Sequence, residues 1–189
     1  MWKGRNALVR RRRAWFCVAV LIALTLMSAG VNDVFCASRQ IQYLKQKTSG
    51  TCTLTAAVML LKETERLSKG RSCAVTEASV REAAWCEEGL YWSFTYGDHT
   101  VNRYSLPREG RAELLQVILK KYPQGIIAYH PTQPHAVWLI AYEEESGTFY
   151  AADPSPAAKE GKLALGETVL KGQTQAEKIE GIEAYWCVE

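Results

Sequence analysis

Residues 46–61 read Gln46-Lys47-Thr48-Ser49-Gly50-Thr51-Cys52-Thr53-Leu54-Thr55-Ala56-Ala57-Val58-Met59-Leu60-Leu61. Apolar residues recur at helical spacing from Leu54 onward, which predicts an amphipathic helix over 53–67 with Cys52 at its start. A thiol at a helix N-terminus faces unpaired N–H groups and the positive end of the helix dipole, and both favour the thiolate. Gln46, one short loop upstream, could donate a side-chain N–H to an oxyanion beside that thiolate. The stretch predicts a nucleophilic cysteine, against the alternative of a small buried thiol and a surface glutamine.

Two further helices are expected along the chain. Lys69-Gly70 ends the first helix, and Thr76 caps a second one over 76–85. Helical spacing returns over 108–122. The segment 88–107 is rich in aromatic and polar residues and has no sustained period. It could line a substrate cleft, or form a surface loop with a hairpin packed on the core.

The C-terminal part of the chain reads as strands. Four apolar segments of strand length lie at 125–130, 135–142, 148–153 and 181–188. A short polar connection joins the second segment to the third, so these two form a hairpin. Helices followed by antiparallel strands are typical of the α+β class. The sequence has no internal repeat or low-complexity linker, and we expect one globular domain over residues 38–189.

Residues 1–37 are expected to form a signal peptide or an N-terminal membrane anchor. Six of the 23 basic residues precede an apolar run over 14–30, which is the pattern of a secretory leader or a single span. Both a signal peptide and an anchor place the domain outside the cytoplasm, as a secreted or a membrane-anchored protein. The rest of the chain holds 17 basic and 20 acidic residues. This balance argues against nucleic-acid binding, and a membrane is expected as a partner only through an uncleaved leader.

The six cysteines divide between the leader and the domain. Cys17 lies in the leader and Cys36 at its end, which leaves four in the domain. Outside the cytoplasm a disulfide could form among three of these, with Cys52 left as the free thiol: Cys73, Cys86 and Cys187. No C-x-x-C pair or clustered Cys/His spacing occurs, so we expect neither a metal nor a cofactor.

His135 and Asp153 lie at one end of the predicted hairpin, at the start of one strand and the end of the next. With a turn centred at Glu145 they fall on the same side of the sheet as diagonal neighbours, with Cβ atoms roughly 7–8 Å apart. An odd register would place them on opposite faces. His99 and His130 are rival bases, but they lie in a turn and before a proline, where solvated or capping roles are common. We therefore predict His135 as the base, oriented by Asp153.

The order Gln46, Cys52, His135 and Asp153-Pro154 resembles the papain-like cysteine peptidases, most closely the bacterial peptidase C39-like family. In that family Gln-x5-Cys begins the central helix, a His opens an apolar strand, and Asp-Pro closes the next strand. The resemblance covers roughly residues 40–188. It implies a papain-like fold, with the nucleophile at the start of a central helix packed on an antiparallel sheet. It also implies a Cys-His-Asp triad, with Gln46 in the oxyanion hole.

Two features depart from that family. Thr53 follows the cysteine, where many members carry Gly. Members that remove double-glycine leader peptides are usually fused to an export transporter and act on its cytosolic side. We find no transporter portion in this sequence and do not expect that substrate.

The expected function is that of an extracellular cysteine peptidase, which hydrolyses peptide or amide bonds of a peptide or protein substrate without a cofactor. A cell-wall amidase or a transglutaminase-like enzyme would use the same residues with a different acceptor. The alternative from another class is a catalytically idle papain-like binding module. Such a module would make contact through its aromatic loop, residues 91–104.

Overall fold

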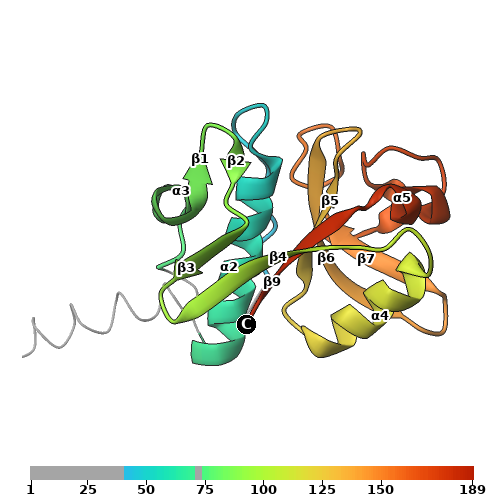
Figure 1. Ribbon diagram of the computed structural model, residues 1–189, viewed down its shortest axis with the longest axis horizontal. Coiled ribbons are helices and arrows are strands. Elements are labelled where there is room, and N and C mark those ends of the chain that lie inside the picture. Colours follow the sequence, from blue (N-terminus) through green and yellow to red (C-terminus); the bar gives the residue numbers. More distant parts are fainter. Residues whose placement is uncertain (1–40, 71–73) are drawn as a thin grey trace, which may run out of the picture. The chain divides into compact units, whose positions relative to one another are not determined.

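The computed structural model of the protein describes residues 41–70 and 74–189. The predicted leader over 1–37 lies outside the described residues. Within them, no helix combines the length and the apolar character needed to cross a membrane. The described residues form helices and antiparallel sheets, so the expected α+β class is confirmed (Figure 1).

The central helix α2 spans Cys52–Lys69, two residues longer than predicted at its C-terminal end. Every residue from Cys52 to Leu61 is buried, so this half of the helix is enclosed on all sides rather than amphipathic. The segment before the helix covers part of it, because Ile41, Tyr43 and Leu44 pack against the same core. Gly70 ends the helix, as predicted, in the left-handed conformation, with φ 69°.

The main sheet has seven antiparallel strands in the order β3-β4-β9-β5-β6-β7-β8. Their bounds are β3 Ser93–Tyr96, β4 His99–Ser105, β9 Ala184–Val188, β5 Ile126–His130, β6 His135–Glu143, β7 Thr148–Ala152 and β8 Leu163–Ala164. A separate two-stranded sheet pairs β1, Trp85–Cys86, with β2, Gly89–Leu90. The sheet places the last strand, β9, between β4 and β5, in the middle of the molecule.

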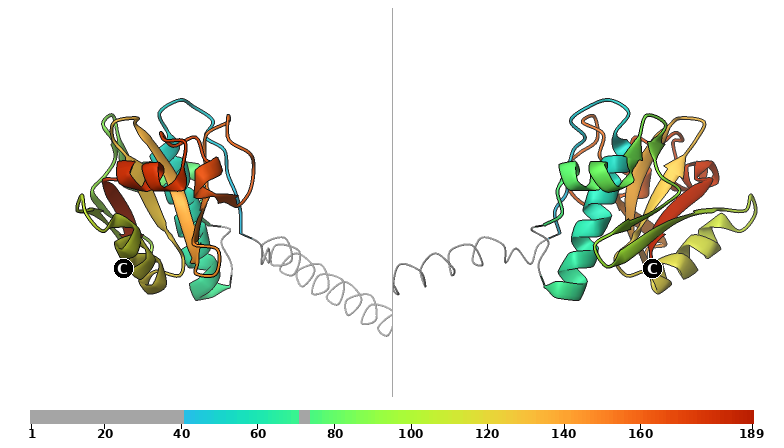
Figure 2. Two further views of the ribbon diagram at one scale, coloured as in Figure 1. Left: turned by 90° about the vertical axis from the view of Figure 1, so that its right-hand side faces the viewer. Right: turned by 60° about the vertical axis from the view of Figure 1, so that its left-hand side comes forward.

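Helices cover both faces of the seven-stranded sheet. The helix α2 and α3, Glu77–Ala84, pack on one face, whereas α4, Arg111–Lys121, and α5, Gln175–Gly181, pack on the other (Figures 1 and 2). Two apolar cores result, one on each side of the sheet. Burial on both sides explains why β6 begins as an unbroken run of buried residues rather than an alternating one.

Several boundaries differ from the sequence-based expectation. The helix capped by Thr76 ends at Ala84, and Trp85 begins β1 instead. The fourth predicted strand begins at Ala184, since Gly181 ends α5, a helix that we did not predict. The segment 88–107 contains β2 and the hairpin of β3 with β4. The segment therefore forms a hairpin packed on the core, and it also contributes residues to a cleft, so both alternatives hold in part.

The hairpin of β6 and β7 contains an irregularity in register at Ile140. On the side away from the turn Trp138 pairs with Ala152, whereas nearer the turn the pairing is shifted by one residue. Continuing the outer register puts Asp153 on the same side of the sheet as His135. The register nearest the turn would have put them on opposite faces, so this bulge determines which way the two side chains point.

Candidate active site

Cys52 is the first residue of α2, as predicted. Its side chain is 5 % exposed and its thiol is free. The residue before it, Thr51, makes no side-chain cap, because its hydroxyl donates to the carbonyl oxygen of Thr48 at 2.7 Å. Among the described residues, the first N–H groups of the helix therefore have no side-chain acceptor. This is a setting in which a thiolate, or an oxyanion formed beside it, is stabilised.

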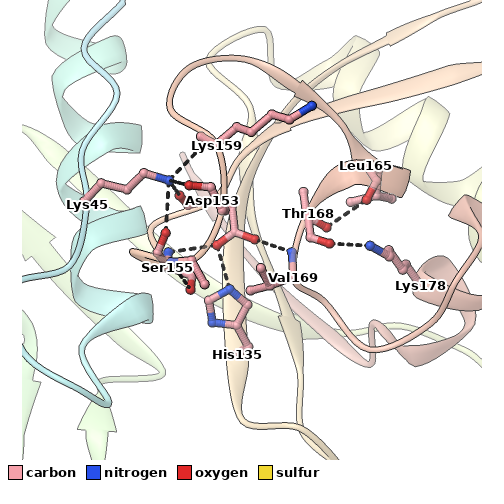
Figure 3. A network of polar contacts seen from close by, with 11 residues as sticks. Lys45, His135, Asp153, Ser155, Lys159, Leu165, Thr168, Val169 and Lys178 are labelled. Carbon is pink, nitrogen blue, oxygen red and sulfur yellow. Dashed lines mark hydrogen bonds and ion pairs between the residues drawn. The ribbon is translucent and has the colours of Figure 1, made fainter.

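His135 and Asp153 are in direct contact. His135 is the first residue of β6 and Asp153 follows β7, and His135 Nε2 lies 2.8 Å from Asp153 Oδ1 (Figure 3). Both residues are buried, with exposed fractions of 8 % and 2 %. Because Asp153 occupies Nε2, Nδ1 is the ring nitrogen left for the thiol of Cys52.

The carboxylate of Asp153 is held by backbone donors as well as by the imidazole. Ser155 N–H donates to Oδ1 at 2.8 Å and Val169 N–H donates to Oδ2 at 2.7 Å (Figure 3). Burial raises the pKa of Asp153, but the hydrogen bonds and the charge of His135 outweigh it and leave the pKa below its ordinary value. Asp153 is thus a fixed anion that sets the plane of the His135 ring.

His135 is held as an imidazolium by its two neighbours. Burial lowers its pKa, but the hydrogen bond to Asp153 and the hydrogen bond to Cys52 outweigh burial and raise the pKa to about 9. The structure therefore brings together three of the four predicted site residues: Cys52, His135 and Asp153. The positive imidazole therefore lies beside the thiol at the start of α2.

Gln46, the fourth predicted site residue, lies in the segment before α2. Its backbone N–H donates to the carbonyl oxygen of Pro154 at 2.7 Å. Its side-chain Oε1 is buried, and among the described residues the amide has no hydrogen-bond partner. The amide does not line the cleft that contains Cys52. Gln46 thus joins the segment before the nucleophile to the residue after Asp153 through its backbone.

Lys45 also connects the segment before α2 to the loop that follows Asp153. This role was not predicted from the sequence. Its Nζ donates to four backbone carbonyl oxygens, at distances of 2.8 to 3.0 Å (Figure 3). The four acceptors belong to Asp153, Ser155, Ala158 and Lys159. This ammonium group sets the shape of the loop after Asp153. A lone lysine in a polar segment gives no sequence signal for such a role.

The rival histidines are engaged elsewhere. His99 Nε2 lies 3.1 Å from Glu65 Oε1, far along α2 from the nucleophile. His130 Nδ1 faces the Thr132 hydroxyl and the Gln133 N–H. Burial is the main cause that lowers the pKa of His130. Neither histidine takes part in the contact with Cys52.

A cleft of about 260 Å³ opens beside Cys52. Four aromatic residues, Trp85, Trp92, Tyr129 and Trp186, line it, together with the charged residues Arg103 and Glu88. Trp92 belongs to the aromatic segment that was expected to line a cleft, whereas Arg103 of the same segment was not singled out from the sequence. Trp186 was not predicted as a cleft residue, because a tryptophan in an apolar strand is expected to be buried in the core.

The other cysteines and the acidic residues complete the inventory of reactive groups. Cys86 and Cys187 are free thiols, so neither of them takes part in the disulfide that the sequence allowed. Cys73 lies outside the described residues. Within 41–70 and 74–189, no group of three His, Cys, Asp or Glu side chains is placed to hold a metal ion.

Comparison with protein-family models and with curated proteins finds no match to this chain.

Proposed function

We propose that this protein is a papain-like cysteine peptidase of the C39-like type, which hydrolyses peptide or amide bonds in a peptide or protein substrate. One observation carries the proposal. The imidazole of His135 lies between the thiol of Cys52 and the carboxylate of Asp153, and the thiol stands at a helix N-terminus beside an open cleft. The reactive cysteine, its base and the group that orients the base are thus assembled in the order that nucleophilic catalysis needs.

The order of elements supports the papain-like part of the proposal. The nucleophile begins a buried central helix, the base opens a strand of an antiparallel sheet, and the orienting carboxylate follows the next strand. The sheet lies between two helical layers. These are the placements that the resemblance to the C39-like family implies.

The first half of the reaction forms an acyl-enzyme. The Cys52 thiolate attacks the substrate carbonyl carbon, and the carbonyl oxygen becomes an oxyanion facing the backbone N–H of Cys52, with the amide of Gln46 as the second donor that the resemblance to the C39-like family implies. His135 gives its Nδ1 proton to the leaving amine, the C–N bond breaks, and a thioester remains on Cys52. Asp153 holds the ring throughout and keeps its own charge.

The second half returns the enzyme to its starting state. The neutral His135 takes a proton from water, and the hydroxide attacks the thioester carbon. The C–S bond breaks, the acid product leaves, and the imidazolium–thiolate pair is restored. If an amine takes the place of water, the same steps give transglutaminase-like transfer. If the substrate is a cell-wall peptide, the same steps make the protein a cell-wall amidase. Peptidase, transferase and amidase therefore differ only in their acceptor and substrate.

The test compares the full-length protein with three variants on a library of internally quenched peptides. Cys52→Ala and His135→Ala should each lower turnover by about 10³-fold or more. Cys86→Ala is the matched control, since Cys86 is also a free thiol but stands outside the contact with His135, and it should retain full activity. Equal turnover by Cys52→Ala and the unmodified protein would refute the proposal.

Two additional readouts separate the alternatives. A peptidyl chloromethyl ketone should add once per chain, on Cys52, as shown by mass spectrometry of the digest. Muropeptides and a soluble amine acceptor, supplied in parallel, identify an amidase or a transferase. A binding module would give no product with any of these and no preferential alkylation of Cys52 over Cys86. Fractionation of cells tests the extracellular location that the leader predicts.

A further inference from the structure

The cleft beside Cys52 contains a guanidinium group stacked between two indole rings. Arg103 Cζ lies 4.6 Å from the ring centroid of Trp92 and 5.1 Å from that of Trp186. All three residues line the cleft together with Cys52. Stacking covers the two faces of the guanidinium and leaves its edge, where the N–H donors point, as the group's free surface.

The stack is fixed by the backbone of the sheet. Arg103 in β4 stands opposite Trp186 in β9, and its N–H donates to the Trp92 carbonyl oxygen at 2.7 Å. Trp186 Nε1 donates to the carbonyl oxygen of Tyr91 at 2.9 Å. The rings and the guanidinium therefore hold their positions without a substrate, which reduces the entropy that binding must overcome.

The donors of this guanidinium have no acceptor within residues 41–70 and 74–189. Among the described residues, Arg103 makes no side-chain hydrogen bond and no ion pair, and its Nε is buried without a partner. Glu88, the acidic residue that lines the same cleft, is exposed and does not pair with it. A buried N–H without an acceptor costs stability, so its retention beside the nucleophile needs a reason.

Trp92 adds a second observation. Its side chain is 74 % exposed, although it is one of the largest apolar side chains of the chain. An exposed indole that covers an arginine at a reactive cysteine can shield a bound group from water, and this strengthens the interaction between charges beneath it.

The geometry points to Arg103 as the specificity-determining residue of the cleft, which receives a substrate carboxylate at the edge of its guanidinium. A carboxylate is the planar acceptor that matches the fork of a guanidinium. The substrates are then peptides with an acidic side chain, or a free C-terminal carboxylate, close to the scissile bond. This inference rests on the proposed function in one respect only: the carboxylate belongs to the molecule that Cys52 attacks.

The first experiment measures hydrolysis of blocked hexapeptides in which one Glu is moved through the positions, each beside its Gln counterpart. The intact protein should prefer Glu over Gln at one position by at least about tenfold in kcat/KM. Arg103→Gln should abolish this preference, and Arg103→Lys should retain part of it. Arg81→Gln is the matched control and should leave the preference intact, since Arg81 also covers an indole, that of Trp85, but does not line the cleft.

The second experiment measures binding without chemistry. Cys52→Ala protein, with and without Arg103→Gln, is titrated with the same peptides, and the fluorescence of the cleft tryptophans is followed. Peptides with a free C-terminus and their amides distinguish a terminal carboxylate from an acidic side chain. Glu peptides should bind about tenfold more tightly, and only when Arg103 is present.

The outcomes separate the two proposals. Arg103-dependent binding of Glu peptides without any turnover would refute the peptidase and leave the carboxylate site standing. Turnover with equal rates for Glu and Gln peptides at every position, unchanged in Arg103→Gln, would overturn the role of Arg103 alone. Thermal unfolding of both Arg103 variants checks that they are folded at the assay temperature.

Discussion

The imidazole Nε2 of His135 lies 2.8 Å from Oδ1 of Asp153, and the two residues are 18 positions apart in the chain. Both side chains are buried, and the carboxylate accepts two more hydrogen bonds from backbone N–H groups. The charge on His135 is thus maintained by contacts within the fold, before any substrate binds. Several measurable properties depend on this charge.

The stability of the protein should fall at alkaline pH through His135. Because its folded-state pKa is about 9, above the ordinary 6.5, the group contributes stability that is complete below about pH 6.5 and is lost as pH rises through about 9. We expect the free energy of unfolding in urea to decrease by up to about 3 kcal/mol over this window. The decrease should be absent in His135→Gln and present in His99→Gln. An identical pH dependence in all three proteins would contradict the raised pKa.

Asp153→Asn should lower the reactivity of Cys52 without removing it. The amide keeps the shape of the carboxylate but not its charge, so the pKa of His135 should fall and the imidazolium should be lost near neutral pH. We expect kcat to drop by about 10²–10⁴-fold, and the alkylation rate of Cys52 at pH 7 to drop as well. Asp98→Asn, at a carboxylate whose side chain is 86 % exposed, is the control. A normal alkylation profile in Asp153→Asn would show that the charge is not needed.

Gln46→Ala tests the proposed oxyanion donor. Because its side-chain amide makes no hydrogen bond among the described residues, the substitution should cost little stability. If the amide donates to the transition state, kcat should fall by roughly 10²–10³-fold with KM nearly unchanged. Labelling of Cys52 by iodoacetamide should persist. Gln42→Ala, in the same segment, is the control, and unchanged turnover in Gln46→Ala would leave the backbone N–H of Cys52 as the sole donor.

Lys45→Met should loosen the loop after Asp153. Four carbonyl oxygens lose their shared donor, and we expect a loss of about 1–3 kcal/mol in the free energy of unfolding. Hydrogen exchange should accelerate at residues 155–159 more than in α2. Lys47→Met, at an exposed lysine of the same segment, should change neither measurement. Protection factors that stay equal in both variants would show that the loop keeps its shape without the ammonium.

The sequence was sufficient for the local elements whose signals are local. The start of α2 at Cys52, its end at Gly70 and the cap at Thr76 follow from short-range chemistry, and all three were predicted. The strands with continuous apolar runs were also predicted, because such a run is itself a short-range signal. The helix α5 was missed, although Thr174 and Glu177 form a capping box at its start, because the helix is short and its residues are mostly polar.

The relation between His135 and Asp153 was predicted on incomplete grounds. A turn centred at Glu145 placed both side chains on the same side of the sheet, which is correct. The pairing next to the turn, however, is shifted by one residue and would place them on opposite faces. The bulge at Ile140 removes this shift before the pairing reaches His135 and Asp153. A bulge of this kind leaves no clear mark in an apolar strand. The placement of Arg103 between two indoles could not be predicted either, because it depends on β9 lying beside β4, a pairing between distant parts of the chain.

The four carbonyl oxygens around Lys45 Nζ resemble the oxygen shell that other proteins build around a calcium ion. Here the positive charge is a covalent part of the chain, seven residues before the nucleophile. The cation at this loop cannot be removed by a chelator or by dilution. The shape of the loop behind Asp153 is therefore independent of the ionic composition of the surroundings, and the same lysine ties it to the segment that leads into Cys52.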